Sequence, residues 1–280
     1  MRREPTFLGW LMLGALAAAL FAGCGETTEP RSEAPALPPA QSMALDLDFF
    51  GDGSAPGVTD LAGTKLNFLN AAVRVAFLNV AVVTVLTPPT LAFEAAVHTL
   101  PSRQDDGSYM WIYTWVDHGL DHQIRLRGMP ENDHVDWELN VVLPGAEPEL
   151  WFSGRSYVNR NEGYWVFRDF TLAGDPEVIR IDWEVNAVDD AFLDITNIYV
   201  GHDEEGDELA YRMDGVMRSV EFHDASAGDD WDITWDESDG SGSLRVPDYN
   251  DGERACWDAD RDDVDCSAAA PGLSASDELR

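Results

Sequence analysis

The feature that most constrains the fold is an alternation of apolar and polar residues that recurs between residues 104 and 246. In residues 135–139 the apolar Val, Trp and Leu alternate with Asp and Glu, and residues 179–185 and 231–235 repeat the pattern. Side chains point alternately to the two faces of a β-strand, so a period of two predicts half-buried antiparallel strands.

Turn-forming residues separate these segments at residues 129–133, 159–163, 173–176 and 238–240. Counting the segments predicts about ten or eleven strands, which is more than an open flat sheet usually holds. The fold class is therefore mainly β (α+β), and we expect a curved antiparallel meander. The alternatives are a β-sandwich and a closed barrel.

A long apolar segment, residues 61–86, precedes the strands, and its polar side chains form only a narrow stripe of Asn67, Asn70 and Arg74. A helix that is apolar nearly all round is buried in protein or lies in a membrane. Arg74 near the middle of a bilayer would cost about 2.5 to 3.5 kcal/mol. We therefore expect a buried helix.

The proline pair at residues 88 and 89 is expected to end this helix, and residues 91–100 to form a short second one. A long apolar helix followed by many strands predicts a sheet packed around that helix, because the apolar faces of both are then buried. This architecture resembles the half-barrel of periplasmic lipoprotein carriers of the LolA/LolB type.

The segment 109–116 is apolar at nearly every position. A strand of this kind is expected to be central and covered on both faces, or to line a cavity. Trp111, Tyr113 and Trp115 are the candidate ligand-binding residues, for an apolar small molecule or a sugar. The alternative is core packing, since aromatic residues favour strands and bury large areas.

The amino terminus has the layout of an export signal, with Arg2 and Arg3 before an apolar run. The run ends in Leu20-Phe21-Ala22-Gly23-Cys24. This end resembles the lipobox of bacterial lipoproteins, although Phe21 replaces the usual Leu. The resemblance implies that Cys24 carries acyl chains such as palmitate and begins the mature chain. A plain secretory signal is the alternative.

The sequence then divides into four parts. Residues 1–23 are the expected lipoprotein signal peptide and residues 24–43 a lipidated, disordered tether rich in Pro, Glu, Ser and Ala. Residues 44–250 are the expected single domain, and residues 251–280 an acidic tail with a disulfide loop. Gly25 in place of Asp after the lipobox implies the outer membrane, if the source has two membranes.

Two cysteines, Cys256 and Cys266, remain once Cys24 is assigned to lipid. Outside the cytoplasmic membrane they are expected to form a disulfide. Their neighbours are acidic, which disfavours a reactive thiolate.

Carboxylates recur at alternate positions between these cysteines, in a pattern that resembles the start of an EF-hand or thrombospondin-type calcium loop. The candidate calcium ligands are Asp258, Asp260, Asp262 and Asp265. Asp263 replaces the glycine of the sharp turn, which departs from the EF-hand pattern. A solvated acidic surface is the alternative, and His118 and His122 form a second, weaker metal candidate.

The net charge is −34, from 52 acidic residues against 18 Lys and Arg. Such a charge repels phosphate backbones, so we expect no nucleic-acid binding. The sequence contains no His-Glu-x-x-His, Gly-x-Ser-x-Gly, P-loop or dinucleotide motif, and no catalytic residue is assigned.

The expected function is that of a lipid-anchored, non-enzymatic binding or structural module of the cell envelope, with an apolar molecule or an envelope protein as partner. The alternative is a carbohydrate-binding or carbohydrate-active surface protein. Nothing in the sequence sets the oligomeric state.

Overall fold

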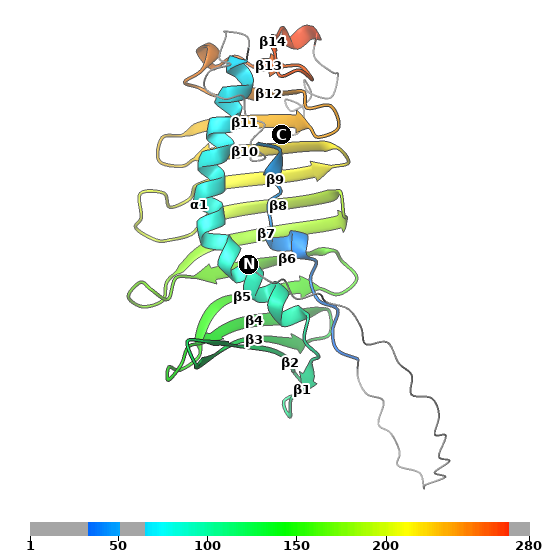
Figure 1. The fold of residues 1–280 in the computed structure, drawn as a ribbon, viewed down its shortest axis with the longest axis vertical. Coiled ribbons are helices and arrows are strands. Elements are labelled where there is room, and N and C mark those ends of the chain that lie inside the picture. The colour runs from blue at the N-terminus through cyan, green and yellow to red at the C-terminus, as the bar shows by residue number, and fades with distance from the viewer. Residues whose placement is uncertain (1–32, 51–64, 269–280) are drawn as a thin grey trace, which may run out of the picture. The chain divides into compact units, whose positions relative to one another are not determined.

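A single antiparallel sheet dominates the structure, a computed structural model that describes residues 33–50 and 65–268. Each strand pairs with its neighbours in sequence, so the sheet is a continuous meander (Figure 1). In order the strands are β1 Ser102–Arg103, β2 Tyr109–Asp117, β3 Leu120–Pro130, β4 His134–Val142, β5 Glu149–Tyr157, β6 Glu162–Arg168, β7 Glu177–Ala187, β8 Asp190–Asn197, β9 Glu208–Asp214, β10 Met217–Asp224, β11 Asp229–Asp236, β12 Gly242–Arg245, β13 Ala255–Trp257 and β14 Asp263–Val264.

The prediction of a mainly β, antiparallel protein is confirmed, but the fourteen described strands exceed the expected ten or eleven. The strands at the two ends of the sheet have two to four residues, too few to produce a visible alternation. The sandwich alternative is wrong, because all described strands belong to one sheet. Residues 251–268, expected as a separate tail, contribute β13 and β14 to this sheet.

One long helix, α1 Leu66–Val97, crosses the strands on one face of the sheet (Figure 1). It continues through the proline pair at residues 88 and 89, so the predicted stop and second helix are wrong. Pro89 is buried, and the Thr90 hydroxyl donates to the carbonyl of Leu86 at 2.8 Å and to that of Met43 at 3.3 Å. Packing and these hydrogen bonds therefore offset the backbone bonds that proline removes.

The helix side chains that the structure describes fall into a buried and an exposed set. Phe68, Val75 and Phe93 are almost inaccessible, whereas Val73 and Leu91 are exposed. The prediction of a helix surrounded by the sheet is thus too strong, since α1 lies against one sheet face. No described helix has the length and hydropathy needed to span a bilayer.

Residues 34–50 form a second element on the same sheet face and include the short helices η1 Ala40–Met43 and η2 Asp48–Phe50. Trp165 Nε1 donates to Ser42 Oγ at 3.1 Å, and the Tyr211 hydroxyl donates to the Asp46 carbonyl at 2.9 Å. Burial raises the pKa of Tyr211. Residues 34–43, which were expected to belong to the tether, are therefore part of the packed structure.

Tryptophan and glycine face each other repeatedly on the sheet face that contacts α1. The cross-strand pairs are Gly128 with Trp137, Gly154 with Trp165, Gly163 with Trp183 and Gly242 with Trp257. In each pair a Cβ on the glycine would lie within 2.7 Å of the indole ring. These tryptophans are buried, so the glycines provide the space in which the large rings form the core.

The opposite sheet face carries charged side chains that pair across strands. Arg127 lies 3.3 Å from Glu138, and Arg155 lies 2.8 Å from Asp136. The guanidinium of Arg180 also lies 4.3 Å from the centre of the Tyr164 ring. This outer face is therefore polar along most of the sheet, as an antiparallel sheet with one covered face requires.

Candidate functional site

The main exception to this polar outer surface is the end of the β2–β3 hairpin. Asp117 pairs with Leu120, which leaves a two-residue turn of His118 and Gly119. Both turn residues have positive φ, 49° and 78°, as a type I′ turn requires. The turn matches the right-handed twist of the strands, so it holds the last residues of β2 and β3 in register.

An aromatic row lies along this hairpin. The ring centroids of Tyr113 and Trp115 are 6.0 Å apart with an interplanar angle of 21°, and those of Trp115 and His122 are 4.9 Å apart at 19°. Trp115 and His122 are cross-strand partners. We call Tyr113, Trp115 and His122 the aromatic row.

The structure places the three predicted ligand-binding residues on one face of β2 but in different environments. Trp111 is only 2% exposed and packs against Trp137, so it belongs to the core. Tyr113 is 38% exposed and Trp115 is partly buried. Two of the three residues are thus available at the surface.

The other face of the hairpin end is also apolar. Val116 is 65% exposed and Ile112 43%, whereas Leu120, which is 54% exposed, pairs with Asp117 and lies on the face of the aromatic row. The first of the two expectations for this strand, a central position with both faces covered, is therefore wrong: β2 is the second strand of the sheet and is exposed on both faces near its end. The alternative, that it lines a cavity, stays a prediction. The apolar composition of β2 therefore reflects an exposed apolar surface. The sequence period alone does not distinguish such a surface from a strand that is covered on both faces.

His122 adds a polar group to this surface. Its Nδ1 atom is buried and has no hydrogen-bond partner within the part of the chain that the structure describes. His118, the other half of the predicted histidine pair, is in the exposed turn. Across residues 33–50 and 65–268, no three His, Cys, Asp or Glu side chains come together as a metal site.

Two of the four candidate calcium ligands, Asp258 and Asp265, accept hydrogen bonds from the backbone of their own loop. Asp258 Oδ1 accepts the N–H groups of Asp260 and Asp262, each at 3.0 Å. Asp265 Oδ1 accepts the N–H of Ser267 at 2.8 Å, and hydrogen bonds from the side chain and backbone of Ser267 lower the pKa of Asp265. Lys65 Nζ lies 3.7 Å from Asp262 Oδ1. The carboxylates of Asp258 and Asp265 thus stabilise turns, and calcium binding by this loop stays a prediction.

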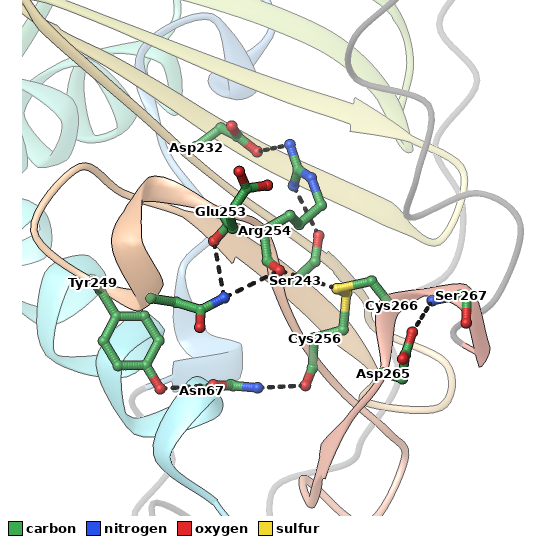
Figure 2. The surroundings of a disulfide bond; sticks show 11 residues. Asn67, Asp232, Ser243, Tyr249, Glu253, Arg254, Cys256, Asp265, Cys266 and Ser267 are labelled. Carbon is green, nitrogen blue, oxygen red and sulfur yellow. Dashed lines mark hydrogen bonds and ion pairs between the residues drawn. A yellow bond between two sulfur atoms is a disulfide. The ribbon is translucent and has the colours of Figure 1, made fainter.

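The predicted disulfide is present in the structure, where Cys256 and Cys266 are bonded with their Cα atoms 5.2 Å apart. Figure 2 shows how the start of α1 is tied to this region. Asn67 Nδ2 donates to the Cys256 carbonyl at 2.7 Å, and Asn67 Oδ1 accepts the Tyr249 hydroxyl at 2.7 Å. The polar stripe of the helix therefore faces the last strands.

A buried ion pair lies beside the disulfide. Asp232 on β11 is 2.7 Å from Arg254 and 3.2 Å from Arg245, and its side chain is only 7% exposed (Figure 2). We call this region, residues 242–268 with Asp232 and Asn67, the carboxy-terminal clasp. Its contacts are internal, so its evident role is structural.

Carboxylates with an altered pKa do not lie at the aromatic row. Burial raises the pKa of Asp194, which is on β8, and that of Glu237, which pairs with Arg218 at 2.9 Å. The aromatic row is on β2 and β3. Among the described residues, the two carboxylates whose pKa burial raises therefore lie outside the strands of the aromatic row.

The exposed hairpin end was not recognised from the sequence as a surface, although its signal was present. An uncharged segment with alternating aromatic and β-branched residues is typical of both a central strand and an interaction edge. The predicted lipidation site, Cys24, lies outside the described residues.

Comparison with known proteins adds no assignment: no family model matches this chain, nor does any curated protein or solved structure. The resemblances to the lipobox and to the LolA/LolB type therefore stay predictions, and the candidate site is interpreted from its geometry.

Proposed function

We propose that this protein is a lipid-anchored, non-enzymatic binding module of the cell envelope whose recognition surface is the end of the β2–β3 hairpin. The observation that carries the proposal is the exposure of Tyr113, Ile112 and Val116 in a segment, residues 109–116, that has no charged side chain, in a chain of net charge −34. Contiguous exposed apolar side chains rimmed by polar residues are typical of interaction sites.

The geometry favours an apolar ligand or the apolar surface of an envelope protein. Tyr113 and Trp115 present near-parallel rings, and aromatic rings bury large apolar areas at little cost in side-chain entropy. The inner sheet face is already occupied by α1 and residues 34–50, so binding at the hairpin surface is favoured over binding inside the sheet.

The anchor is part of the same proposal. The lipobox-like sequence 20–24 supports lipidation of Cys24, and Gly25 in place of Asp after it favours the outer membrane if the source has two membranes. More than one acyl chain makes anchoring stable, where one chain alone is marginal.

Lipidation is tested by growing expressing cells with labelled palmitate. The wild-type chain should become labelled and partition with membranes, and Cys24→Ala should abolish the label. An unlabelled wild-type chain, or a labelled Cys24→Ala chain, would contradict the anchor.

Ligand binding is tested by native mass spectrometry of the exported, lipidated chain released from detergent. We expect added mass that organic solvent removes, which is lost in Trp115→Ala and kept in Trp231→Ala. Trp231 is a matched control because it is also partly buried but lies on β11. Equal ligand content in both variants would argue against the aromatic row.

A carbohydrate ligand is the second candidate, favoured by the near-parallel exposed rings of the aromatic row, on which sugar faces stack. A glycan array probed with the same two variants separates the candidates. Glycan binding that is lost in Trp115→Ala, in a chain whose native mass spectrum shows no ligand that organic solvent removes, would favour the carbohydrate ligand.

A further inference from the structure

The side of β2 that faces away from β3 is unpaired over most of the length of β2. β1 pairs only with Tyr109 and Met110, through Arg103 and Ser102. Within residues 33–50 and 65–268, no strand pairs with residues 111–117 on the side away from β3. Seven residues of β2 therefore form an unpaired edge.

Alternate residues of this edge direct their backbone groups outward. The Ser108 carbonyl accepts the N–H of Gln104 at 2.8 Å, so position 108 faces the β1 side. Backbone groups alternate in direction along a strand, so Ile112, Thr114 and Val116 also direct their N–H and C=O groups to the open edge. This edge can form three pairs of strand hydrogen bonds.

The edge has none of the features that usually prevent pairing between molecules. Edges are normally blunted by Lys, Pro, bulges or shortness, but β2 has nine residues, no Lys or Pro and no break in its register with β3. The other edge differs, because β14 has two residues and lies within the carboxy-terminal clasp. The β14 edge is thus too short for extended pairing with another strand, whereas the β2 edge is long enough to pair.

We propose that the occupant of this edge is β2 of a second copy of the chain, paired antiparallel about a two-fold axis at Thr114. The open stretch 111–117 is centred on Thr114, so two copies pair along its whole length. Thr114 then lies opposite Thr114 of the partner subunit, and Ile112 lies opposite Val116 of the partner subunit. These are the residues whose backbone groups face outward, so the register satisfies the hydrogen bonds of both strands.

Neighbouring elements limit the pairing to the same seven residues. β1 blocks β2 up to Met110, and in this register the partner's turn at His118 comes opposite that position. Pairing therefore stops at both ends without displacing either β1 strand.

The side chains also complement one another under two-fold symmetry. On one face the Thr114 pair lies between two Ile–Val pairs, and on the other Tyr113 lies opposite Trp115 of the partner subunit. Aromatic pairs and Thr–Thr pairs stabilise adjacent strands. Asp117, opposite Trp111 of the partner subunit, is the one charged residue of the paired stretch 111–117, so the two acidic molecules meet along a segment with a single carboxylate in each copy.

This inference deepens the proposed function, because it names a second copy as a partner of the same hairpin. The net charge opposes association at low ionic strength, and salt screens that repulsion. The dimer is therefore expected to strengthen as salt is added.

Sedimentation of the full lipidated chain in density-matched detergent tests the oligomeric state. We expect a dimer for the wild type and dimerisation at least about tenfold weaker for Thr114→Lys, since like charges directly opposite destabilise strand pairs. Thr234→Lys is the matched control, because Thr234 lies on β11 between neutral partners. A monomeric wild type at high salt, or equal weakening by both variants, would overturn the proposal.

Cysteine cross-linking in the cell tests the register and does not depend on ligand. Directly opposite hydrogen-bonded residues have Cα atoms about 5.5 Å apart, within the span of a disulfide. Thr114→Cys should give a disulfide-linked dimer, whereas Ile112→Cys should stay monomeric because its two copies are separated by about four residues of strand. Linkage through Ile112→Cys without Thr114→Cys would overturn the register.

The two proposals fail independently. A monomeric chain that still loses its ligand in Trp115→Ala overturns the dimer and leaves the proposed function standing. A dimer with the Thr114→Cys linkage but no ligand and no glycan binding supports the inference and overturns the binding role.

Discussion

Asp263, on the last strand, accepts a hydrogen bond of 2.9 Å from the backbone N–H of Asn67 in the first turn of α1. Its second carboxylate oxygen accepts the N–H of Leu66 at 3.2 Å. The residue before the helix, Lys65, provides no side-chain cap. The helix is therefore capped by a carboxylate 196 residues away in sequence, which couples its first turn to the carboxy-terminal clasp.

This cap predicts the effect of Asp263→Ala. The change leaves two N–H groups without their acceptor and removes a negative charge from the positive end of the helix dipole. We expect the free energy of unfolding to fall by about 1 kcal/mol, measured by urea denaturation. Asp260→Ala removes the same charge from the same loop and is the control; an equal loss there would refute the capping role.

The disulfide predicts a second stability effect. Cys256 and Cys266 close a short loop, and removing such a link costs about 3 kcal/mol in the chain-entropy model. Replacing both residues with Ala should lower the free energy of unfolding by that order and increase amide exchange in β13 and β14. Unchanged exchange in these strands would mean that the other clasp contacts hold them without the bond.

The buried ion pair of Asp232 and Arg254 predicts a loss of stability when the pair is broken. Asp232→Asn removes the carboxylate charge that pairs with Arg254, itself largely buried, and we expect the free energy of unfolding to fall by about 3 kcal/mol in urea denaturation. The exposed pair of Arg160 and Glu162 is the comparison, since surface pairs contribute at most about 1 kcal/mol. If Glu162→Gln costs as much as Asp232→Asn, burial is not the cause.

The glycine–tryptophan pairs predict a coupling that a double-mutant cycle measures. A Cβ at position 128 would lie 2.7 Å from the Trp137 ring, and its three nearest atoms all belong to that ring. Gly128→Ala should therefore cost about 1 to 3 kcal/mol, and less when Trp137 is replaced by Leu.

Gly163 supplies the control for that cycle. At this position the Arg155 carbonyl oxygen would also lie 2.1 Å from the added Cβ. Changing Trp183 to Leu should therefore not rescue Gly163→Ala. Additive effects at positions 128 and 137 would contradict the account of the paired glycine.

The lowered pKa of Asp106 predicts part of the dependence of folding stability on pH under acidic conditions. Hydrogen bonds from the Ser108 side chain and backbone, together with Arg127, lower the pKa of Asp106 to about 2. A pKa lowered in the folded state contributes stability above the unfolded value near 4, and this contribution is lost as the pH falls toward 2. Carbon-detected NMR titration should show the low pKa.

The matching variant is Asp106→Asn, in which stability should fall less steeply between pH 4 and 2 than in the wild type. Asp105→Asn is the control for loss of a neighbouring charge. An unchanged slope in Asp106→Asn would show that this carboxylate does not link protonation to folding.

The alternation of apolar and polar residues was sufficient to predict most of the strands. In β4 the alternation of Val135, Trp137 and Leu139 with acidic residues predicted both the strand and its buried face, and the structure confirms it. Turn residues such as Asn159 and Gly240 predicted where strands end, because they adopt positive φ. The disulfide followed from the cysteine count and the expected compartment.

The sequence by itself therefore determined a succession of antiparallel strands, because side-chain period and turn chemistry are local properties. Only the tertiary structure decided what covers each strand. It kept α1 helical through Pro88 and Pro89, supplied the distant cap from Asp263, and placed the apolar β2 near an edge instead of the centre. Burial and capping depend on residues far apart in the chain, and no local pattern specifies which of them meet.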